Sequence, residues 1–242
     1  MIDGGDRIAV GVSGGKDSMT LLCGLAKLRE FFPRRFELEA VTITMGIGNF
    51  DTAPITELCE KLGVRHTIEE THIGKIIFEE RKESNPCSMC ANLRRGALNN
   101  AAARLGCNKL ALAHNRDDVV ETLVMSMFYE GRIHTFSPVT HFKRKNIIMI
   151  RPLLYVWEKD IKGFVKSEGI VTVRNDCPAN GHTTRQKVKE LLADLSRENR
   201  DLKVNLAGAV IRSGIDGWTP VRSSRYGGSD KPADELKDGN KT

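Results

Sequence analysis

The stretch Ser13-Gly14-Gly15-Lys16-Asp17-Ser18 decides how this chain folds and what it binds. It follows the apolar run 7–12 (RIAVGV) and precedes the amphipathic run 19–32, so the pattern predicts a strand, a glycine-rich turn and a helix. Two glycines allow a tight turn whose N–H groups approach an anion, and a helix start points further free N–H groups at the same place. Lys16 adds a point charge that suits phosphate. Ser13 and Ser18 add hydroxyl donors, and Asp17 can hold a metal ion or orient a phosphate. We therefore expect nucleotide phosphates to bind here.

The whole chain has the size and composition of a soluble globular domain. It has 242 residues, 40% of them hydrophobic, and a formal net charge of +6. No run reaches the length of a membrane span and the first residues lack a signal-peptide pattern, so we expect a cytoplasmic protein with no membrane partner. The positive charge permits a polyanionic partner without requiring one. Six cysteines in a reducing compartment point to metal or redox chemistry rather than to disulfides.

Strand and helix patterns alternate along the chain. The predicted strands cover residues 7–12, 36–44, 64–68, 109–113 and 147–150, and the predicted helices cover residues 19–32, 53–62, 92–105, 118–129, 157–168 and 185–199. This alternation predicts an α/β fold, a parallel twisted sheet with helices on both faces, and ligands at the carboxyl ends of the strands. We assign residues 1–213 to one domain. Residues 214–242 contain almost no apolar side chains, so we expect a disordered tail there.

The hexapeptide SGGKDS at 13–18 is not a Walker A loop, which needs G-x-x-x-x-G-K-[ST]. It resembles the PP-loop of the N-type ATP pyrophosphatases. This resemblance implies that the chain cleaves ATP between the α- and β-phosphates, adenylylates a substrate oxygen and releases pyrophosphate. ATP and Mg²⁺ are the implied cofactors. Lys16 and Asp17 are the implied catalytic residues, and the implied nucleotide-binding residues are Ser13, Gly14, Gly15, Lys16, Asp17 and Ser18.

A second motif, Ala113-His114-Asn115-Arg116-Asp117-Asp118, follows a predicted strand and leads into a helix. It resembles the AHHxDD motif of the tRNA-modifying branch of the PP-loop family, and 151–154 (RPLL) resembles the RPL segment of that branch. His114 and Asp117 match and are the implied cofactor-binding residues of this motif. Asn115 replaces a histidine, so no role is carried over to it. Asp117 and Asp118 also suit the N-terminal cap of the following helix. Capping the helix and binding the cofactor do not exclude each other.

Three cysteines have the spacing and surroundings of metal ligands. Cys87 and Cys90 form a C-x-x-C on a predicted turn before a helix, and Cys177 is followed by a proline in a loop. Two thiolates at this spacing can bind one metal centre, and three thiolates fit a [4Fe-4S] cluster with one open iron. A zinc site or a redox dithiol, with Cys177 not involved, is the alternative. The other cysteines are predicted to be small core residues: Cys23, Cys59 and Cys107.

Taken in order, these motifs resemble the tRNA 2-thiocytidine synthetase (TtcA) family over roughly residues 2–200. The resemblance implies ATP-dependent adenylylation of C2 of a cytidine, at position 32 of tRNA, and replacement of its oxygen by sulfur with the help of the cluster. It departs in three places. A family helix before the first strand is missing, Asn115 replaces a histidine, and the sequence beyond Arg200 matches no pattern of the family.

Two alternatives remain open from the sequence. A lysidine-synthase-like tRNA ligase shares the PP-loop and the RPL segment but needs no cluster. A zinc-stabilised nucleotide- or RNA-binding module would not turn over ATP. The expected partners are tRNA, a sulfur donor such as a cysteine desulfurase or free sulfide, and a second copy of the chain in a homodimer. The basic residues that suit RNA are Arg94, Arg95, Arg104, Arg132, His134, His141, Lys143, Arg144, Lys145, Lys187, Lys189, Arg197 and Arg200.

Overall fold

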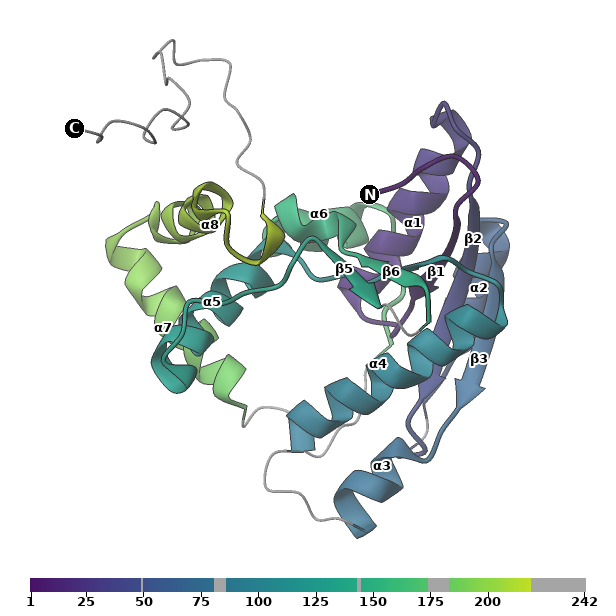
Figure 1. Cartoon of the computed structure of the whole chain (residues 1–242), viewed down its shortest axis with the longest axis horizontal. Coiled ribbons are helices and arrows are strands. Elements are labelled where there is room, and N and C mark those ends of the chain that lie inside the picture. The colour runs from purple at the N-terminus through teal and green to yellow at the C-terminus, as the bar shows by residue number, and fades with distance from the viewer. Residues whose placement is uncertain (49, 81–85, 143–144, 174–182, 219–242) are drawn as a thin grey trace, which may run out of the picture.

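A computed structural model describes residues 1–48, 50–80, 86–142, 145–173 and 183–218. The centre of the fold is a six-stranded sheet, in these described residues, with the order β3-β2-β1-β4-β6-β5 (Figure 1). Neighbouring strands are parallel except for β5, which pairs antiparallel with β6 at one edge. The strands are β1 (Arg7–Gly11), β2 (Glu37–Thr44), β3 (Arg65–Glu70), β4 (Lys109–Ala111), β5 (Val139–Phe142) and β6 (Ile147–Ile150).

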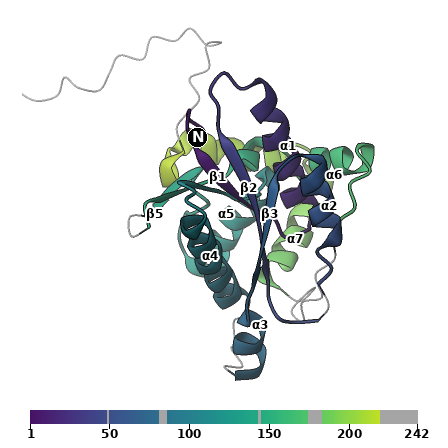
Figure 2. The same cartoon turned by 90° about the vertical axis from the view of Figure 1, so that its right-hand side faces the viewer.

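Helices cover both faces of the sheet (Figure 2). Because side chains alternate along a strand, Ile8 and Val10 of β1 point to one face and Ala9 to the other. The first face packs against α1 (Lys16–Phe31) and α2 (Ala53–Lys61). The second face packs against α4 (Pro86–Arg104) and the short α3 (Ile73–Lys75), which continues into a π-helical turn at Ile76–Glu80.

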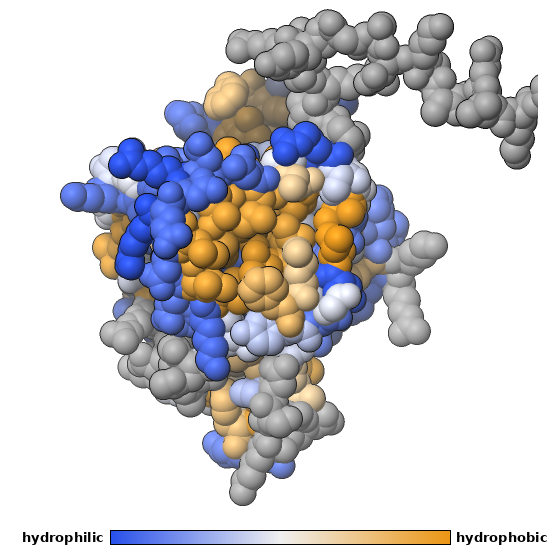
Figure 3. All heavy atoms as spheres, turned by 90° about the vertical axis from the view of Figure 1, so that its left-hand side faces the viewer, coloured by the Kyte–Doolittle hydropathy of each residue, from blue (hydrophilic) through white to orange (hydrophobic). Residues whose placement is uncertain are grey.

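The remaining helices lie beside the sheet, apart from α6 (Glu158–Ser167), which packs on α1. Helix α5 (Arg116–Glu130) packs against α7 (Thr184–Glu198) and α8 (Leu202–Ser213), with Val120, Leu192 and Ala207 buried between them. These three helices form the side of the molecule that Figure 3 shows, and an apolar area is visible on it. The exposed large hydrophobic side chains of these helices are Met127, Phe128, Tyr129, Leu191, Leu195 and Val204. No helix in the described part of the chain combines the length and apolar character that crossing a bilayer requires.

The predicted fold class is confirmed, and most predicted elements lie within a few residues of the observed ones. The structure differs from the prediction in several places. Strand β5, the short α3 with its π-helical turn and helix α8 were not predicted, and α4 begins at Pro86 rather than at residue 92. At the C-terminal end, a 3-10 turn (Ile215–Gly217) follows α8, and Trp218 is buried. Residues 215–218 therefore pack on the fold, although the predicted tail was expected to begin at Gly214. The rest of the predicted tail, 219–242, lies outside the described residues.

The strand order explains where a site can form. From β1 the chain runs to β2 and β3 on one side, whereas β4, on the other side of β1, is followed by β6 and β5. In such sheets the loops after the two central strands diverge and leave a crevice at their carboxyl ends. Here those loops are 12–15 after β1 and 112–115 after β4, and they contain the two motifs that the sequence singled out.

Candidate functional site at the strand ends

The loop after β1 has a conformation that only glycine allows. Gly14 has φ +74°, and a Cβ built there would lie 2.7 Å from the Cβ of Val173. The Val173 N–H donates to the Gly14 carbonyl at 2.9 Å. Ser18 Oγ accepts from the Ser13 N–H at 3.1 Å and donates to the Gly15 carbonyl at 3.0 Å, which closes the turn. Gly15 is the N-cap of α1 and provides no side-chain cap, so the first N–H groups of α1 are left for an anion.

Lys16 and Asp17 lie in the first turn of α1 and contact each other. Lys16 Nζ is 2.7 Å from Asp17 Oδ2 and 3.0 Å from Glu158 Oε1. Burial acts to lower the pKa of Lys16, but its pairs with Asp17 and Glu158 outweigh burial and raise the pKa. The Glu158 carboxylate also accepts a hydrogen bond from Lys189 Nζ at 3.1 Å and forms an ion pair with Lys162 Nζ at 3.2 Å. Burial acts to raise the pKa of Glu158, but the hydrogen bonds from Lys16 and Lys189 lower it to about 2.

The loop after β4 caps α5 and contacts the first loop. Asn115 is the N-cap: its Oδ1 accepts from the Asp118 N–H at 3.1 Å, and the Asp118 carboxylate accepts from the Asn115 N–H at 2.9 Å. This reciprocal pair is a capping box. Asn115 Nδ2 also donates to Asp17 Oδ1 at 2.9 Å, so the two motifs are joined by one hydrogen bond.

Asp117 was predicted as a cofactor-binding residue, and its carboxylate has two protein partners. It accepts from the Glu158 N–H at 2.8 Å and from Lys203 Nζ at 2.9 Å, which links α5 to the start of α6 and to α8. On the same side, the Arg116 guanidinium lies 4.3 Å from the ring centre of Trp157, the N-cap residue of α6. Asp117 still borders the polar pocket beside Lys16, so its predicted role stays a prediction.

That polar pocket encloses about 190 Å³ and contains several acidic groups. Burial, despite the hydrogen bond with Asn115, raises the pKa of Asp118. Burial and then the charge of Asp118 raise the pKa of Glu121. Arg185 Nη1 donates to Glu121 Oε2 at 3.2 Å and partly neutralises this charge. The pocket is lined by Lys16, Asp17, Asn115, Asp117, Asp118, Glu121, Glu158, Thr183, Arg185, Gln186 and Lys189.

A larger cavity of about 410 Å³ lies between the carboxyl ends of β1, β2 and β4 and helix α4. Its apolar walls come from the strand ends, and its charged groups are mostly arginines. A cavity with these properties can hold a flat aromatic base beside anionic groups. The polar and aromatic residues that line it are Ser13, Asp17, Ser18, Arg94, Arg95, His114, Phe136 and Arg151.

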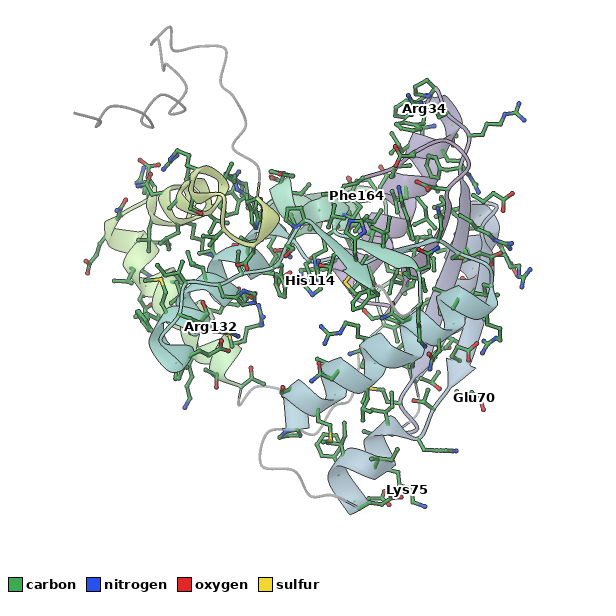
Figure 4. All side chains as sticks on the ribbon, viewed as in Figure 1. Arg34, Glu70, Lys75, His114, Arg132 and Phe164 are labelled. Atoms are coloured by element: carbon green, nitrogen blue, oxygen red, sulfur yellow. The ribbon has the colours of Figure 1, made fainter. Side chains whose placement is uncertain are left out.

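His114 lies in the middle of the molecule at the wall of this cavity (Figure 4). Its ring packs on Phe136, with the ring centres 4.2 Å apart, and its buried Nδ1 has no hydrogen-bond partner among the described residues. Burial, then the charges of Arg151, Arg185 and Arg95, lowers the pKa of His114 to about 3. The imidazole is therefore neutral at physiological pH and suits hydrogen bonding to a ligand rather than proton transfer.

Phe136 and Arg151 line the cavity beside His114 and are held in place by further contacts. Arg151 Nη1 donates to the Ser137 carbonyl at 2.5 Å and to Thr140 Oγ1 at 3.0 Å. Burial, then repulsion from Arg95, lowers the pKa of Arg151 to about 10. The indole N–H of Trp218 donates to the Phe136 carbonyl at 2.9 Å. Trp218, which lies in the segment beyond Arg200 that matched no family pattern, thus supports the residue on which His114 packs.

The C-x-x-C lies in the first turn of α4, not on a turn before the helix as predicted, because the helix begins at Pro86. Cys87 is exposed, and Cys90 is half-buried with its Sγ 3.6 Å from Met45 Sδ. Residues three apart share one face of a helix, and the adjacent Ala91 lines the larger cavity. Cys177 lies outside the described residues, within which no group of three or more His, Cys, Asp or Glu side chains is arranged to hold a metal ion.

The other cysteines match their predicted structural role to different degrees. Cys59 and Cys107 are buried, and burial raises the pKa of each thiol to about 11. Cys23 is only half-buried. Burial raises its pKa as well. Thiols with raised pKa values are poor nucleophiles and poor metal ligands at neutral pH, which is consistent with packing roles.

The basic residues predicted to contact RNA have different surroundings in the structure. Arg94 and Arg95 line the larger cavity. Others are paired: Arg104 with Glu69, Lys189 with Glu158, and Arg197 with Asp194. Lys143 and Arg144 lie outside the described residues. Sequence reasoning assigned no site role to Glu158 or Arg185, and none to Asn115 or Arg151 although both stand in motifs that it singled out; all four line one of the two cavities.

Comparison with known proteins places this site in a family. Residues 3–195 match the PP-loop domain family. The chain is 42% identical over 213 residues to the tRNA-cytidine(32) 2-sulfurtransferase of Geobacter sulfurreducens, covering 87% of this chain and 83% of that protein. It is 40% identical to the enzyme of the same name from Syntrophotalea carbinolica, covering 87% and 82%.

Among solved structures, the U34-tRNA thiolase NcsA from Methanococcus maripaludis, determined with its [4Fe-4S] cluster, has a similar fold. The TM-score is 0.73 at 24% identity, with 87% of this chain and 72% of that chain covered. Together with the two loops that meet at the centre of the sheet, these findings show that the chain belongs to the PP-loop family, within the group of the tRNA-cytidine(32) 2-sulfurtransferases.

Proposed function

We propose that this protein is an ATP-dependent tRNA sulfurtransferase that adenylylates C2 of a cytidine, at position 32, and replaces its oxygen by sulfur. The observation that carries the proposal is the arrangement of three sequence motifs around one cavity. The loops 12–15 and 112–115 border it, and α4, whose first turn contains Cys87 and Cys90, borders it from Ala91 onward. The names of the relatives, which specify tRNA and cytidine 32, support the choice of substrate.

The residues present fit ATP. Gly14 lets the backbone approach phosphate without a Cβ, and the free N–H groups of the first turn of α1 favour negative charge. In this proposal Lys16 neutralises charge on the departing pyrophosphate. Asp17 borders both cavities, so its carboxylate can hold the metal ion that accompanies ATP. When bound, Mg²⁺ supplies charge neutralisation and fixes the geometry of the phosphates.

The residues that line the larger cavity fit the nucleoside that reacts. Arg94 and Arg95 bring positive charge to the cavity, which suits the phosphates that flank a base drawn out of an RNA loop. The neutral imidazole of His114 and the ring of Phe136 offer a hydrogen-bonding group and an aromatic surface to the base. Closure of the cavity around the base excludes water from the activated carbon.

The start of α4 fits an iron–sulfur cluster. Cys87 and Cys90 lie on one face of the first helical turn, where the helix dipole stabilises thiolates. Cys177 is proposed as the third ligand. A [4Fe-4S] cluster with one open iron supplies a place to hold sulfide near the activated base. The sulfur donor, a cysteine desulfurase or free sulfide, stays a proposal.

A homodimer is proposed on the apolar area of α5, α7 and α8. Phe128 is 64% exposed and Leu195 is 43% exposed, and apolar areas of this kind mark association sites on soluble proteins. Light scattering on wild-type protein and a Phe128→Glu variant tests it. A monomeric wild type contradicts the dimer.

The function is tested by purifying the protein without oxygen and measuring iron, sulfide and zinc, followed by thiolation of tRNA with ATP. We expect iron and sulfide in the wild type, and loss of both iron and thiolation in the Cys87→Ser, Cys90→Ser and Cys177→Ser variants. The matched controls, which should keep the cluster, are Cys23→Ala, Cys59→Ala and Cys107→Ala. Zinc without iron would favour a binding module, and a metal-free protein that modifies tRNA without sulfur would favour a lysidine-synthase-like ligase.

A further inference from the structure

Asn115 is almost completely buried between the two strand-end loops. Only 3% of its surface is exposed. A backbone N–H needs an acceptor, so the amide oxygen must face the Asp118 N–H, and the NH₂ group must then face Asp17. The amide can have only this orientation, because its oxygen faces a donor and its nitrogen faces an acceptor. One side chain thus caps α5 and holds a residue that lies 98 positions earlier in the chain.

Among the described residues, the Asp17 carboxylate has one charged and one neutral side-chain partner. The charged partner of the Asp17 carboxylate is Lys16, at 2.7 Å from Oδ2. Asn115 instead holds Oδ1 with a neutral donor at 2.9 Å. A neutral donor fixes the position of a carboxylate without cancelling its charge, so the carboxylate remains able to attract a metal ion.

We propose that Asn115 is a positioning residue that fixes Asp17 for binding of Mg²⁺ with ATP, a proposal that rests on the PP-loop site proposed above. Capping of α5 does not by itself require asparagine, because serine, threonine and aspartate cap helices comparably well. Of these residues only asparagine combines a capping oxygen with a neutral NH₂ donor that reaches Asp17. The asparagine stands where the family motif has histidine, and the structure gives that departure a function.

The test uses isothermal titration of the full chain with ATP at a series of Mg²⁺ concentrations, without tRNA or sulfur donor. In Asn115→Ser the cap is kept and the NH₂ donor is removed. We expect the Mg²⁺ concentration for half-maximal ATP binding to rise about ten-fold, the size expected for a hydrogen bond to a charged group. The midpoint of thermal unfolding should change little, because serine still caps α5.

The chain provides a matched control in Asn108, at the opposite end of the sheet. Its Oδ1 accepts from the Arg7 N–H at 2.9 Å and its Nδ2 donates to Asp6 Oδ1 at 2.8 Å, the same pair of bonds that Asn115 makes. Asn108→Ser should leave the Mg²⁺ dependence within about two-fold of wild type. A second variant, Asn115→Asp, keeps a capping oxygen but places like charge beside Asp17, and it should weaken MgATP binding more than Asn115→Ser does.

The outcomes separate the two proposals. If the wild type does not bind MgATP, the proposed function fails. If the wild type binds MgATP and both Asn115 variants need no more Mg²⁺ than wild type, the positioning role of Asn115 is overturned while the function stands. Equal losses in Asn115→Ser and Asn108→Ser would also overturn it, because a general loss of stability would then explain both.

Discussion

Replacing Glu158 by glutamine should destabilise the protein in a way that depends strongly on pH. The Glu158 carboxylate is 14% exposed and receives Lys16 and Lys189. Its pKa falls from 4.5 to about 2 in the folded protein. At neutral pH this shift corresponds to about 3 kcal/mol of stability. Because the folded-state pKa is depressed, the contribution is present above pH 4.5 and disappears as the pH falls towards 2; near pH 3 about 1 kcal/mol remains.

Thermal unfolding followed by circular dichroism checks this expectation. For a domain of this size, about 3 kcal/mol lowers the melting temperature by roughly 6–12 °C at pH 7. The difference between wild type and Glu158→Gln should shrink to less than half near pH 3. Glu57→Gln serves as control, because Glu57 is exposed and makes no ion pair among the described residues. An equal difference at pH 7 and pH 3, or none at pH 7, would refute the reasoning.

Three further expectations concern the site. Lys16→Ala and Asp17→Ala should each abolish ATP-dependent turnover with an unchanged far-ultraviolet spectrum, because both side chains point to the phosphate end rather than to the core; full activity in either variant would remove the PP-loop assignment. Complete reaction mixtures with tRNA and sulfide should contain AMP and pyrophosphate, and finding only ADP and phosphate would contradict the adenylylating mechanism. The imidazole of His114, followed by nuclear magnetic resonance, should not titrate between pH 5 and pH 8, since its pKa is about 3; a midpoint near the ordinary value would mean that the ring is not buried as described.

The sequence predicted what depends on local pattern. The loop 13–18 is decided by its own glycines and by the strand and helix on either side, and the structure confirms that strand, turn and helix. The motif 113–118 was predicted in the same way, but the predicted cap was only partly right: the N-cap of α5 is Asn115, Asp118 completes the capping box, and Asp117 does not cap the helix. Strand β5 was missed because its four residues (VTHF) form a short edge strand with a weak apolar pattern. The helical start of the C-x-x-C could have been found, since proline is common at the first position of a helix, as Pro86 is here.

Contacts between residues that are far apart in the chain could not be predicted from the sequence. One partner of the Asp117 carboxylate is Lys203, which is 86 positions away, and nothing in either local pattern indicates the pair. The same is true of Lys16 and Glu158, whose meeting depends on α6 packing against α1. Asn115 was set aside because it departs from the family motif, yet its contact with Asp17 can be seen only once β1 and β4 are neighbours.

The position of the tryptophans gives the protein a built-in optical signal. The chain has only two, Trp157 and Trp218. Trp157 precedes the residue that holds Lys16 and lies against the guanidinium of Arg116, while Trp218 donates to the carbonyl of Phe136, on whose ring His114 packs. Tryptophan emission responds to charge and to polarity nearby. The intrinsic fluorescence of the unlabelled protein therefore reports on its two cavities, and the single variants Trp157→Phe and Trp218→Phe divide that signal between the phosphate side and the base side.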